Sequence, residues 1–272
     1  MGEEKRGLTP FPFLAVGDRV AISTASDETM VEDIHPRRSR LSRRHPHHRH
    51  LEQVIAANVD QVLIVVSAES PAFRPDVTDL YLVAASANNL SAILIITKCD
   101  LASEAAINAI AARYRKLRMP ILRTRPDEPA TIERLRRYIL VGKVSVMVGL
   151  SGVGKSTLRN ALLPESQGRA ATAAVSEKSG QGRHVTTAAT FEPLFPSGFL
   201  VDTPGVRDIS PWGLSARDVR AHFPEFADAE CQFNDCAHVK EPGCDVRSRV
   251  ERGEASYERL ASMLAIMAAC GE

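Results

Sequence analysis

The stretch from Lys143 to Leu158 reads KVSVMVGLSGVGKSTL and contains the residue types needed to hold a triphosphate. An apolar run leads into Gly149–Ser156, which matches the pattern G-x-x-x-x-G-K-[ST]. Glycines allow backbone N–H groups to close around phosphate oxygens, Lys155 can reach the β and γ phosphates, and Ser156 can hold Mg²⁺. We therefore predict a P-loop that opens a helix near Lys155, in preference to a chance glycine-rich turn. The predicted nucleotide contacts are Gly149, Leu150, Ser151, Gly152, Val153, Gly154, Lys155, Ser156 and Thr157, with Lys155 also catalytic.

A second short motif, Thr97-Lys98-Cys99-Asp100, follows an apolar run and resembles the [NT]-K-x-D pattern by which GTPases recognise their base. The Asp100 carboxylate would accept hydrogen bonds from guanine N1–H and the 2-amino group. Adenine offers neither donor, so the carboxylate would be left unpaired in the wrong complex. The alternative is that Asp100 only caps a helix beginning near Ala102. The P-loop in the same chain favours guanine selection.

A third element, Asp202-Thr203-Pro204-Gly205, follows the apolar run Phe199–Val201 and fits the D-x-x-G pattern of GTPases, although a simple Pro-Gly turn is the alternative. Asp202 would hold Mg²⁺ through water, and the Gly205 N–H would contact the γ-phosphate. The polar residues 179–187 before it fit a switch loop. Thr186 and Thr187 in that loop are candidates for Mg²⁺. Val206 stands where many GTPases carry a glutamine that orients the attacking water. His184 is our candidate for that task, and the alternative is that His184 is only an exposed loop histidine.

The order of these motifs along the chain is unusual. In ordinary GTPases the base selector comes last, whereas here Thr97–Asp100 precedes the P-loop and D-x-x-G comes last. We therefore predict a circularly permuted GTPase domain. The loop beyond Gly205 would then join the nucleotide site directly to the C-terminal segment. We therefore hypothesise that residues 206–230 shift when GTP binds or is hydrolysed.

Four candidate metal ligands lie close together near the C-terminus. Cys231, Cys236, His238 and Cys244 form the pattern C-x4-C-x-H-x5-C. A closed set of three thiolates and one imidazole predicts a single structural zinc ion, which would replace the core that so short a segment cannot build. Unrelated thiols are the alternative, and Cys99 and Cys270 need no such role.

The elements that must position these motifs can also be read from the sequence. Continuous apolar runs at 58–67 and 92–97 predict buried parallel strands, and 78–87 predicts a helix between them, so the fold class is α/β. Two further strands are expected near 16–22 and 30–37, and a helix at 255–269. The predicted domains are a partial OB-like β module with a basic run (1–55), the circularly permuted P-loop GTPase domain (56–210) and a small zinc-binding, helix-containing domain (211–272).

Composition and charge limit the classes of partner that this protein can have. With 44% hydrophobic and 25% charged residues, the 272-residue chain is typical of a water-soluble protein. Its apolar runs are too short to span a bilayer, and its N-terminus lacks the features of a signal peptide, so we expect a cytoplasmic protein without a membrane partner. The net charge is +1, but residues 35–50 read HPRRSRLSRRHPHHRH, without one acidic residue. This run is either a solvated linker or a phosphate-contact surface.

Together these residues resemble the ribosome small-subunit-dependent GTPase A family of circularly permuted GTPases. The resemblance covers the chain from about Val16 onward and includes motifs at the following positions: GDRV at 17–20, I-x-P-R at 34–37, AANVDQ at 56–61, GLSGVGKST at 149–157, GRHxTT at 182–187, DTPG at 202–205, and the Cys-Cys-His-Cys run ending in EPGC. It implies an OB-fold that, with the zinc domain, contacts ribosomal RNA. It also implies a GTPase that assists late maturation of the small ribosomal subunit and is stimulated by it. We expect a monomer that uses GTP, Mg²⁺ and Zn²⁺ and does not bind DNA.

The chain departs from that family at several positions. Few residues precede Gly17, which predicts a truncated OB-like module; Thr97 stands where asparagine is commoner, Val185 replaces a threonine, and residues 123–126 lack the usual Ser-Ala. These departures predict weaker nucleotide binding. They keep open a second hypothesis, an RNA- or ribosome-binding module whose nucleotide site is structural or a very slow switch. An ATP-using P-loop kinase is a third.

Overall fold

The computed structural model describes residues 14–23, 30–45, 48, 50–125, 127–139, 142–163, 190–194, 197–203 and 211–271. The strands are β1 (Val20–Ser23), β2 (Met30–Ile34), β3 (Arg40–Arg44), β4 (Glu52–Ala57), β5 (Gln61–Ser67), β6 (Ser91–Thr97), β7 (Ile121–Arg123), β8 (Val144–Val148), β9 (Thr190–Pro193) and β10 (Phe199–Asp202). The helices are α1 (Pro75–Ala87), α2 (Glu104–Tyr114), η1 (Arg115–Leu117), α3 (Pro129–Tyr138), α4 (Lys155–Leu162), α6 (Ala216–Val219), η2 (Arg220–His222), α7 (Asp245–Glu251) and α8 (Tyr257–Gly271).

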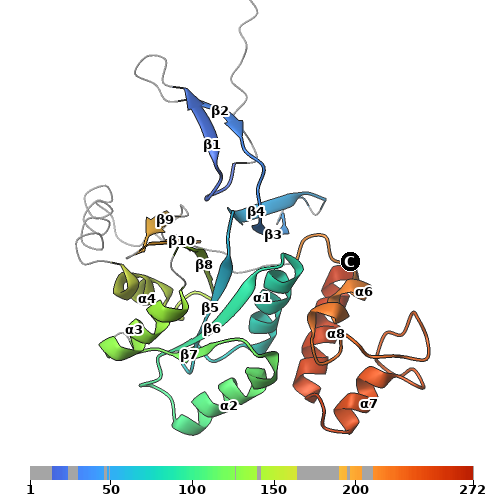
Figure 1. Cartoon of the computed structure of the whole chain (residues 1–272). Helices are drawn as coiled ribbons and strands as arrows, with labels where there is room; N and C mark the ends of the chain where they lie inside the picture. The colour runs from blue at the N-terminus through green and yellow to red at the C-terminus, as the bar shows by residue number, and fades with distance from the viewer. Residues whose placement is uncertain are drawn as a thin grey trace, which may run out of the picture.

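A six-stranded sheet in the order β7-β6-β5-β8-β10-β9 forms the centre of the molecule (Figure 1). All its neighbours are parallel except β9, which runs antiparallel to β10. Every residue of β5 is buried, as expected for a parallel strand covered on both faces. The α/β prediction is therefore confirmed, and the two strands predicted at 58–67 and 92–97 correspond to β5 and β6.

Two layers of helices cover the sheet. One hydrophobic cluster joins the strands to α1 and α2 through Tyr81, Ile107 and Tyr114, and a second joins them to α3 and α4 through Leu135 and Leu158. Helix α1 begins at Pro75, three residues before the predicted start, because proline fits the first turn of a helix. The P-loop strand β8 lies inside the sheet, between β5 and β10, and so has a partner on each side.

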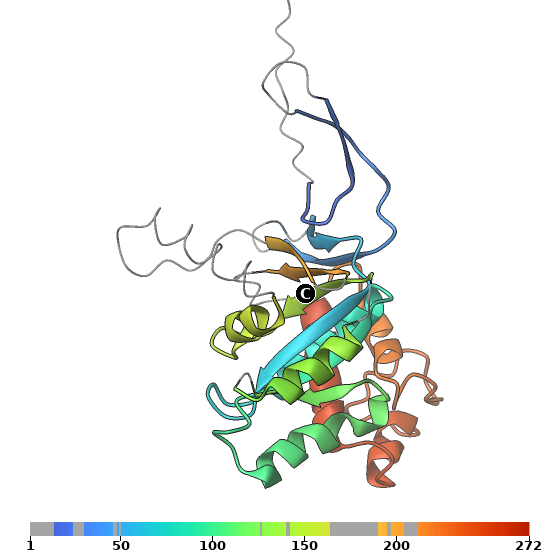
Figure 2. The same ribbon diagram turned by 60° about the vertical axis from the view of Figure 1, so that its left-hand side comes forward.

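The N-terminal residues form two antiparallel hairpins. The β1–β2 hairpin stands clear of the central sheet in Figure 1 and in the turned view of Figure 2. The β3–β4 hairpin packs against the core, with Leu41 and Ala56 almost fully buried. Strand β3 lies within the basic run, so a disordered linker is the wrong interpretation for residues 40–44. These strands agree with the predicted OB-like module.

The C-terminal segment, residues 211–271, builds its own small core and docks on α1. Its cluster includes Phe223, Phe226 and Met263, and it also takes in Val83 from α1. Figure 1 shows α6 and α8 beside α1. Helix α8 confirms the helix predicted at 255–269. Within the described residues, no helix is long and apolar enough to cross a membrane.

A buried ionic network joins α1 to this segment. The Arg259 guanidinium of α8 donates to the Asp79 carboxylate at 2.6 Å and also to Glu225, and Arg113 of α2 reaches Asp79 at 3.1 Å. Asp79 has no exposed side-chain surface, and the Arg259 side chain is only 4% exposed. The Arg259 guanidinium also lies over the Phe223 ring, 4.4 Å from its centroid. Because a buried charge without its partner is costly, this network ties the C-terminal segment to the α/β unit.

Candidate functional site

The P-loop connects the end of β8 to the start of α4. Gly149 approaches β5 so closely that a Cβ atom would lie 2.3 Å from the Val65 carbonyl oxygen, which excludes any other residue there. Gly154 precedes the helix with φ = 97°, a conformation that glycine adopts without strain. The Lys155 ammonium donates to the carbonyl oxygens of Gly149 and Leu150, at 2.7 and 2.8 Å. The lysine thus lies across the loop in which a phosphate would sit.

The predicted base selector touches this loop directly. Thr97 ends β6, two strands from β8, and its hydroxyl lies 2.5 Å from the Val153 carbonyl oxygen of the P-loop and 3.1 Å from the Val66 carbonyl oxygen of β5. A Cβ atom on Gly154 would lie 3.6 Å from the same hydroxyl. The two motifs, 56 residues apart at this hydrogen bond, therefore share one edge of the sheet. Threonine provides the link between selector and loop although it replaces the commoner asparagine.

Lys98 and Asp100 lie just beyond this contact. Lys98 adopts φ = 53°, which is rare outside glycine, and its ammonium donates to the Ser70 carbonyl oxygen in the loop after β5. Pro71 of the same loop lies 3.7 Å from the Cβ position of Gly152. The Asp100 side chain is exposed, as a base-reading carboxylate must be. Cys99 is half-buried and contacts the Ile96 carbonyl oxygen, so it has a packing role.

Asp202 lies on the other side of the P-loop strand. It ends β10, in register with Met147 of β8, and the neighbouring Thr203 hydroxyl donates to the Met147 carbonyl oxygen at 3.1 Å. Burial raises the pKa of the Asp202 carboxyl, while the positive charges of Arg159 and Lys155 oppose that rise. The mostly buried Asp202 carboxylate and the exposed Ser156 hydroxyl in the first turn of α4 are hard oxygen donors of the kind that Mg²⁺ prefers.

Sequence reasoning missed two charged residues next to Asp202. Arg159 of α4 forms a two-pronged ion pair with Glu192 of β9, and its Nε atom lies 4.0 Å from an Asp202 oxygen. Arg159 follows the P-loop pattern by only three positions, but nothing in the sequence pointed to its partner. The pair forms because β9 returns antiparallel beside β10.

Four of the predicted site residues lie outside the described residues. These are His184, Thr186, Thr187 and Gly205. Their assignments remain predictions.

The four predicted zinc ligands converge. The ligand atoms of Cys231, Cys236, His238 and Cys244 all lie within 4.8 Å of one another. The Nδ1 atom of His238 is 3.5 Å from the sulfurs of Cys231 and Cys244, and those two sulfurs are 4.0 Å apart. Tetrahedral Zn²⁺ with Zn–S of about 2.3 Å and Zn–N of about 2.0 Å would place its ligands about 3.5 Å (N to S) and 3.8 Å (S to S) apart. The donor set and its spacing therefore fit one zinc ion.

Neighbouring groups hold these ligands in place. The Glu241 carboxylate accepts hydrogen bonds from the backbone N–H groups of Ala237, Val239 and Lys240 and so shapes the turn that carries His238. Burial of Cys231 opposes thiolate formation, but hydrogen bonds from the Val246 and Asp245 backbone N–H groups and from the Cys236 and Cys244 thiols together lower the pKa of this thiol. Backbone N–H groups that favour a thiolate are typical of structural zinc sites. Glu241 was not predicted as a site residue.

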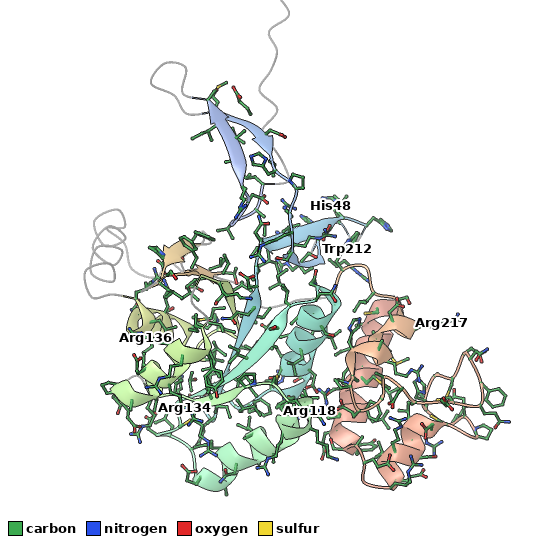
Figure 3. The ribbon with its side chains drawn as sticks, in the orientation of Figure 1. His48, Arg118, Arg134, Arg136, Trp212 and Arg217 are labelled. Atoms are coloured by element: carbon green, nitrogen blue, oxygen red, sulfur yellow. The ribbon has the colours of Figure 1, made fainter. Side chains whose placement is uncertain are left out.

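The basic run is partly used for internal ion pairs. Arg37 pairs with Asp18 at 2.6 Å, and Arg38 donates twice to Asp60, at 2.6 and 2.8 Å. The Arg38 side chain nevertheless remains 53% exposed. His48 is exposed in the connection between β3 and β4, and Pro211, the neighbour of Trp212, bridges to Arg43 of β3; His48 and Trp212 are labelled in Figure 3. A surface with several exposed basic groups therefore remains on this hairpin.

Comparison of the sequence with known protein families and proteins points to one family. The family model described as RsgA GTPase matches residues 34–212. The small ribosomal subunit biogenesis GTPase RsgA of Gemmatimonas aurantiaca is 43% identical over 254 residues, which cover 92% of this chain and 82% of that protein. The protein of the same name from Chlorobaculum parvum is 37% identical over 265 residues, with coverage of 93% and 84%.

Two solved structures share the fold. The crystal structure of YjeQ from Thermotoga maritima aligns with a TM-score of 0.72 and 32% identity, over 94% of this chain and 84% of that one. The crystal structure of YloQ, described as a circularly permuted GTPase, aligns with a TM-score of 0.67 and 25% identity, over 97% and 82%. The predicted circular permutation is confirmed.

Proposed function

The chain belongs to the RsgA GTPase family and is a GTP-hydrolysing enzyme, and on this basis we propose that it binds the small ribosomal subunit and assists its late maturation. In this proposal GTP is hydrolysed to GDP and phosphate, and the subunit stimulates turnover. One observation carries the nucleotide assignment: the Thr97 hydroxyl meets the Val153 carbonyl oxygen, which brings the guanine selector and the P-loop together.

Each side chain of the site then has a defined role. The P-loop amides and Lys155 stabilise negative charge on the β and γ phosphates, for which Lys155 exchanges its carbonyl partners for phosphate oxygens. Asp100 accepts hydrogen bonds from the guanine edge, and the Lys98 stem packs along the base.

Mg²⁺ would be held by Ser156 and Asp202 together with Thr186 or Thr187, and it supplies charge neutralisation between the phosphates. His184 is the proposed residue for positioning the attacking water. Arg159 and Lys155 favour the ionised form of the mostly buried Asp202 carboxyl, and Glu192 adds a second negative charge nearby, so an anionic oxygen is available to the metal.

We also propose that the chain acts as three units: a basic OB-like module at 1–55, the GTPase domain at 56–210 and a zinc-binding domain at 211–272. Exposed basic side chains on the first and last units, including His48 and Arg217, are available for the phosphates of ribosomal RNA (Figure 3). One zinc ion holds the last unit. We further propose a cytoplasmic monomer that does not bind DNA.

The direct test is GTP turnover titrated with small ribosomal subunits. We expect turnover to rise with subunit concentration to a plateau, and large subunits serve as the matched control. Lys155→Ala should abolish both basal and stimulated turnover, because the phosphate charge loses its main cationic partner. Absence of both stimulation and measurable hydrolysis would favour the binding-module hypothesis with a structural nucleotide site.

A further inference from the structure

A second ionic arrangement lies beside the proposed magnesium ligand. Arg159 of α4, the helix that follows the P-loop, contacts Glu192 of β9 and lies near Asp202 at the end of β10. Its Nε atom donates to one Glu192 oxygen at 2.6 Å, and Nη2 donates to the other. The same Nε atom lies 4.0 Å from an Asp202 oxygen. All three side chains are between 14% and 16% exposed, so water screens these charges only partly.

Charges of both signs act on Asp202. Arg159 and Lys155 stabilise the ionised Asp202 carboxylate, whereas Glu192 destabilises it. Glu192 also receives both hydrogen bonds of the guanidinium fork and therefore neutralises most of the Arg159 charge. The electrostatic potential at Asp202 thus depends on how completely the negative charge of Glu192 cancels the positive charge of Arg159.

We propose that Arg159 is a positioning residue that sets the Mg²⁺ affinity of the Asp202 site, with Glu192 as the counter-ion that limits its effect. A cation near Asp202 repels a second cation, so Arg159 weakens Mg²⁺ binding, and Glu192 restores part of it. The inference rests on the proposed function, because it takes Asp202 as a ligand of the magnesium that accompanies the nucleotide.

Two single substitutions should act in opposite directions. Arg159→Met keeps the length of the side chain and removes its charge, so the negative charges of Asp202 and Glu192 lose this cation and Mg²⁺ binds more tightly. Glu192→Gln leaves Arg159 uncompensated beside Asp202, so Mg²⁺ binds more weakly. If the pair served only to brace α4 against β9, both substitutions would loosen the site and weaken Mg²⁺ binding.

The experiment measures release of a fluorescent GDP analogue from the full-length protein at a series of free Mg²⁺ concentrations. For each variant, the Mg²⁺ concentration that gives half-maximal retention is compared with that of the unaltered protein. We expect a decrease of about threefold to tenfold for Arg159→Met and an increase of similar size for Glu192→Gln, since charges about 4 Å apart interact strongly when partly buried. The double variant should return close to the unaltered value.

The exposed Arg134 of α3 provides the control, because Arg134→Met removes one charge elsewhere on the surface and should leave the half-point unchanged (Figure 3). Thermal melting of each variant checks folding. If Arg159→Met does not fold, the double variant decides, because charge compensation returns its half-point close to the unaltered value, whereas loss of a brace weakens Mg²⁺ binding. Shifts of the same sign in both single variants, or no shift in either, would overturn this inference and leave the proposed function untouched. Mg²⁺-independent retention by the unaltered protein would overturn the magnesium role of Asp202, whereas the proposed function is tested separately by GTP turnover with small subunits.

Discussion

The hydrogen bond from Thr97 to the P-loop leads to a specific prediction for GTP affinity. Replacement by valine keeps the shape of the side chain but removes the hydroxyl. The Thr97 side chain is buried, and the Val153 carbonyl oxygen that it meets belongs to a residue that is only 3% exposed. Without the donor, this acceptor loses a partner that water cannot easily replace.

The magnitude follows from that geometry. An unpaired buried acceptor costs about 1–3 kcal/mol, and the loop can recover part of this by moving toward water in the nucleotide-free protein. GTP binding must then reverse the movement, so most of the cost appears as lost affinity. We expect Thr97→Val to weaken GTP binding by about 1–2 kcal/mol, which corresponds to about 5- to 30-fold.

The assay is titration of a fluorescent GTP analogue at saturating Mg²⁺, with Thr97→Ser as the matched variant. Serine retains the hydroxyl and should bind GTP nearly as well as the unaltered protein. Equal affinity of the valine variant and the unaltered protein, with both folded, would refute the idea that this hydroxyl joins selector and loop. Equal losses in the serine and valine variants would show that the packing of the whole threonine side chain, and not its hydroxyl alone, controls the affinity.

Three further predictions concern the C-terminal segment. Arg259→Met should destabilise the protein by about 3–5 kcal/mol in urea unfolding, because it leaves the fully buried Asp79 without its main partner, whereas Arg252→Met at a half-exposed pair should cost less than about 1 kcal/mol. Chelation of the metal, or Cys236→Ala, should unfold the zinc-binding segment and expose it to protease, while retention of GDP persists; simultaneous loss of both would contradict a purely structural metal. Burial lowers the pKa of the His222 imidazole below its ordinary value of 6.5. As pH falls the unfolded chain therefore binds this proton before the folded protein does, and the free energy of unfolding should decrease below pH 6.5. Urea unfolding between about pH 5 and pH 7 should show a smaller decrease for His222→Gln, and an equal pH dependence in the two proteins would refute this.

The parts of the fold that could be predicted are those whose signals are local. Strands β5 and β6 are continuous apolar runs because both faces of a parallel sheet are covered, and this pattern is visible in the sequence alone. The zinc ligands were predicted because Cys231, Cys236, His238 and Cys244 lie within one short segment, where spacing alone restricts the geometry. The P-loop was predicted for the same reason.

Contacts that depend on sheet order could not be predicted. Thr97 meets Val153 because β5 lies between β6 and β8, and no local pattern states that order. Arg259 and Asp79 are 180 residues apart, and Arg159 and Glu192 are 33 apart. In each case the charged residue would have been assigned to the solvated surface, since charges are rarely buried unless they are paired.

The basic run illustrates the opposite error. Its lack of acidic residues predicted either a solvated linker or a phosphate-contact surface, but Leu41 is almost fully buried and anchors β3 to the core. Arg37 and Arg38 pair with Asp18 and Asp60, which lie far enough away in the sequence that the composition of the run did not reveal them. Local charge therefore overestimated the number of cations free to contact a nucleic acid.

The central claim is that Asp100 and the P-loop bind the two ends of one guanine nucleotide. The most direct measurement compares GTP and xanthosine triphosphate binding to the unaltered protein and to Asp100→Asn, with Asp127→Asn as the surface control. Asparagine can donate to the C2 oxygen of xanthine but cannot accept from the guanine edge as a carboxylate does. We predict that Asp100→Asn loses about 1.5–3 kcal/mol of GTP affinity and gains affinity for xanthosine triphosphate. Unchanged GTP affinity in the folded variant would contradict the claim.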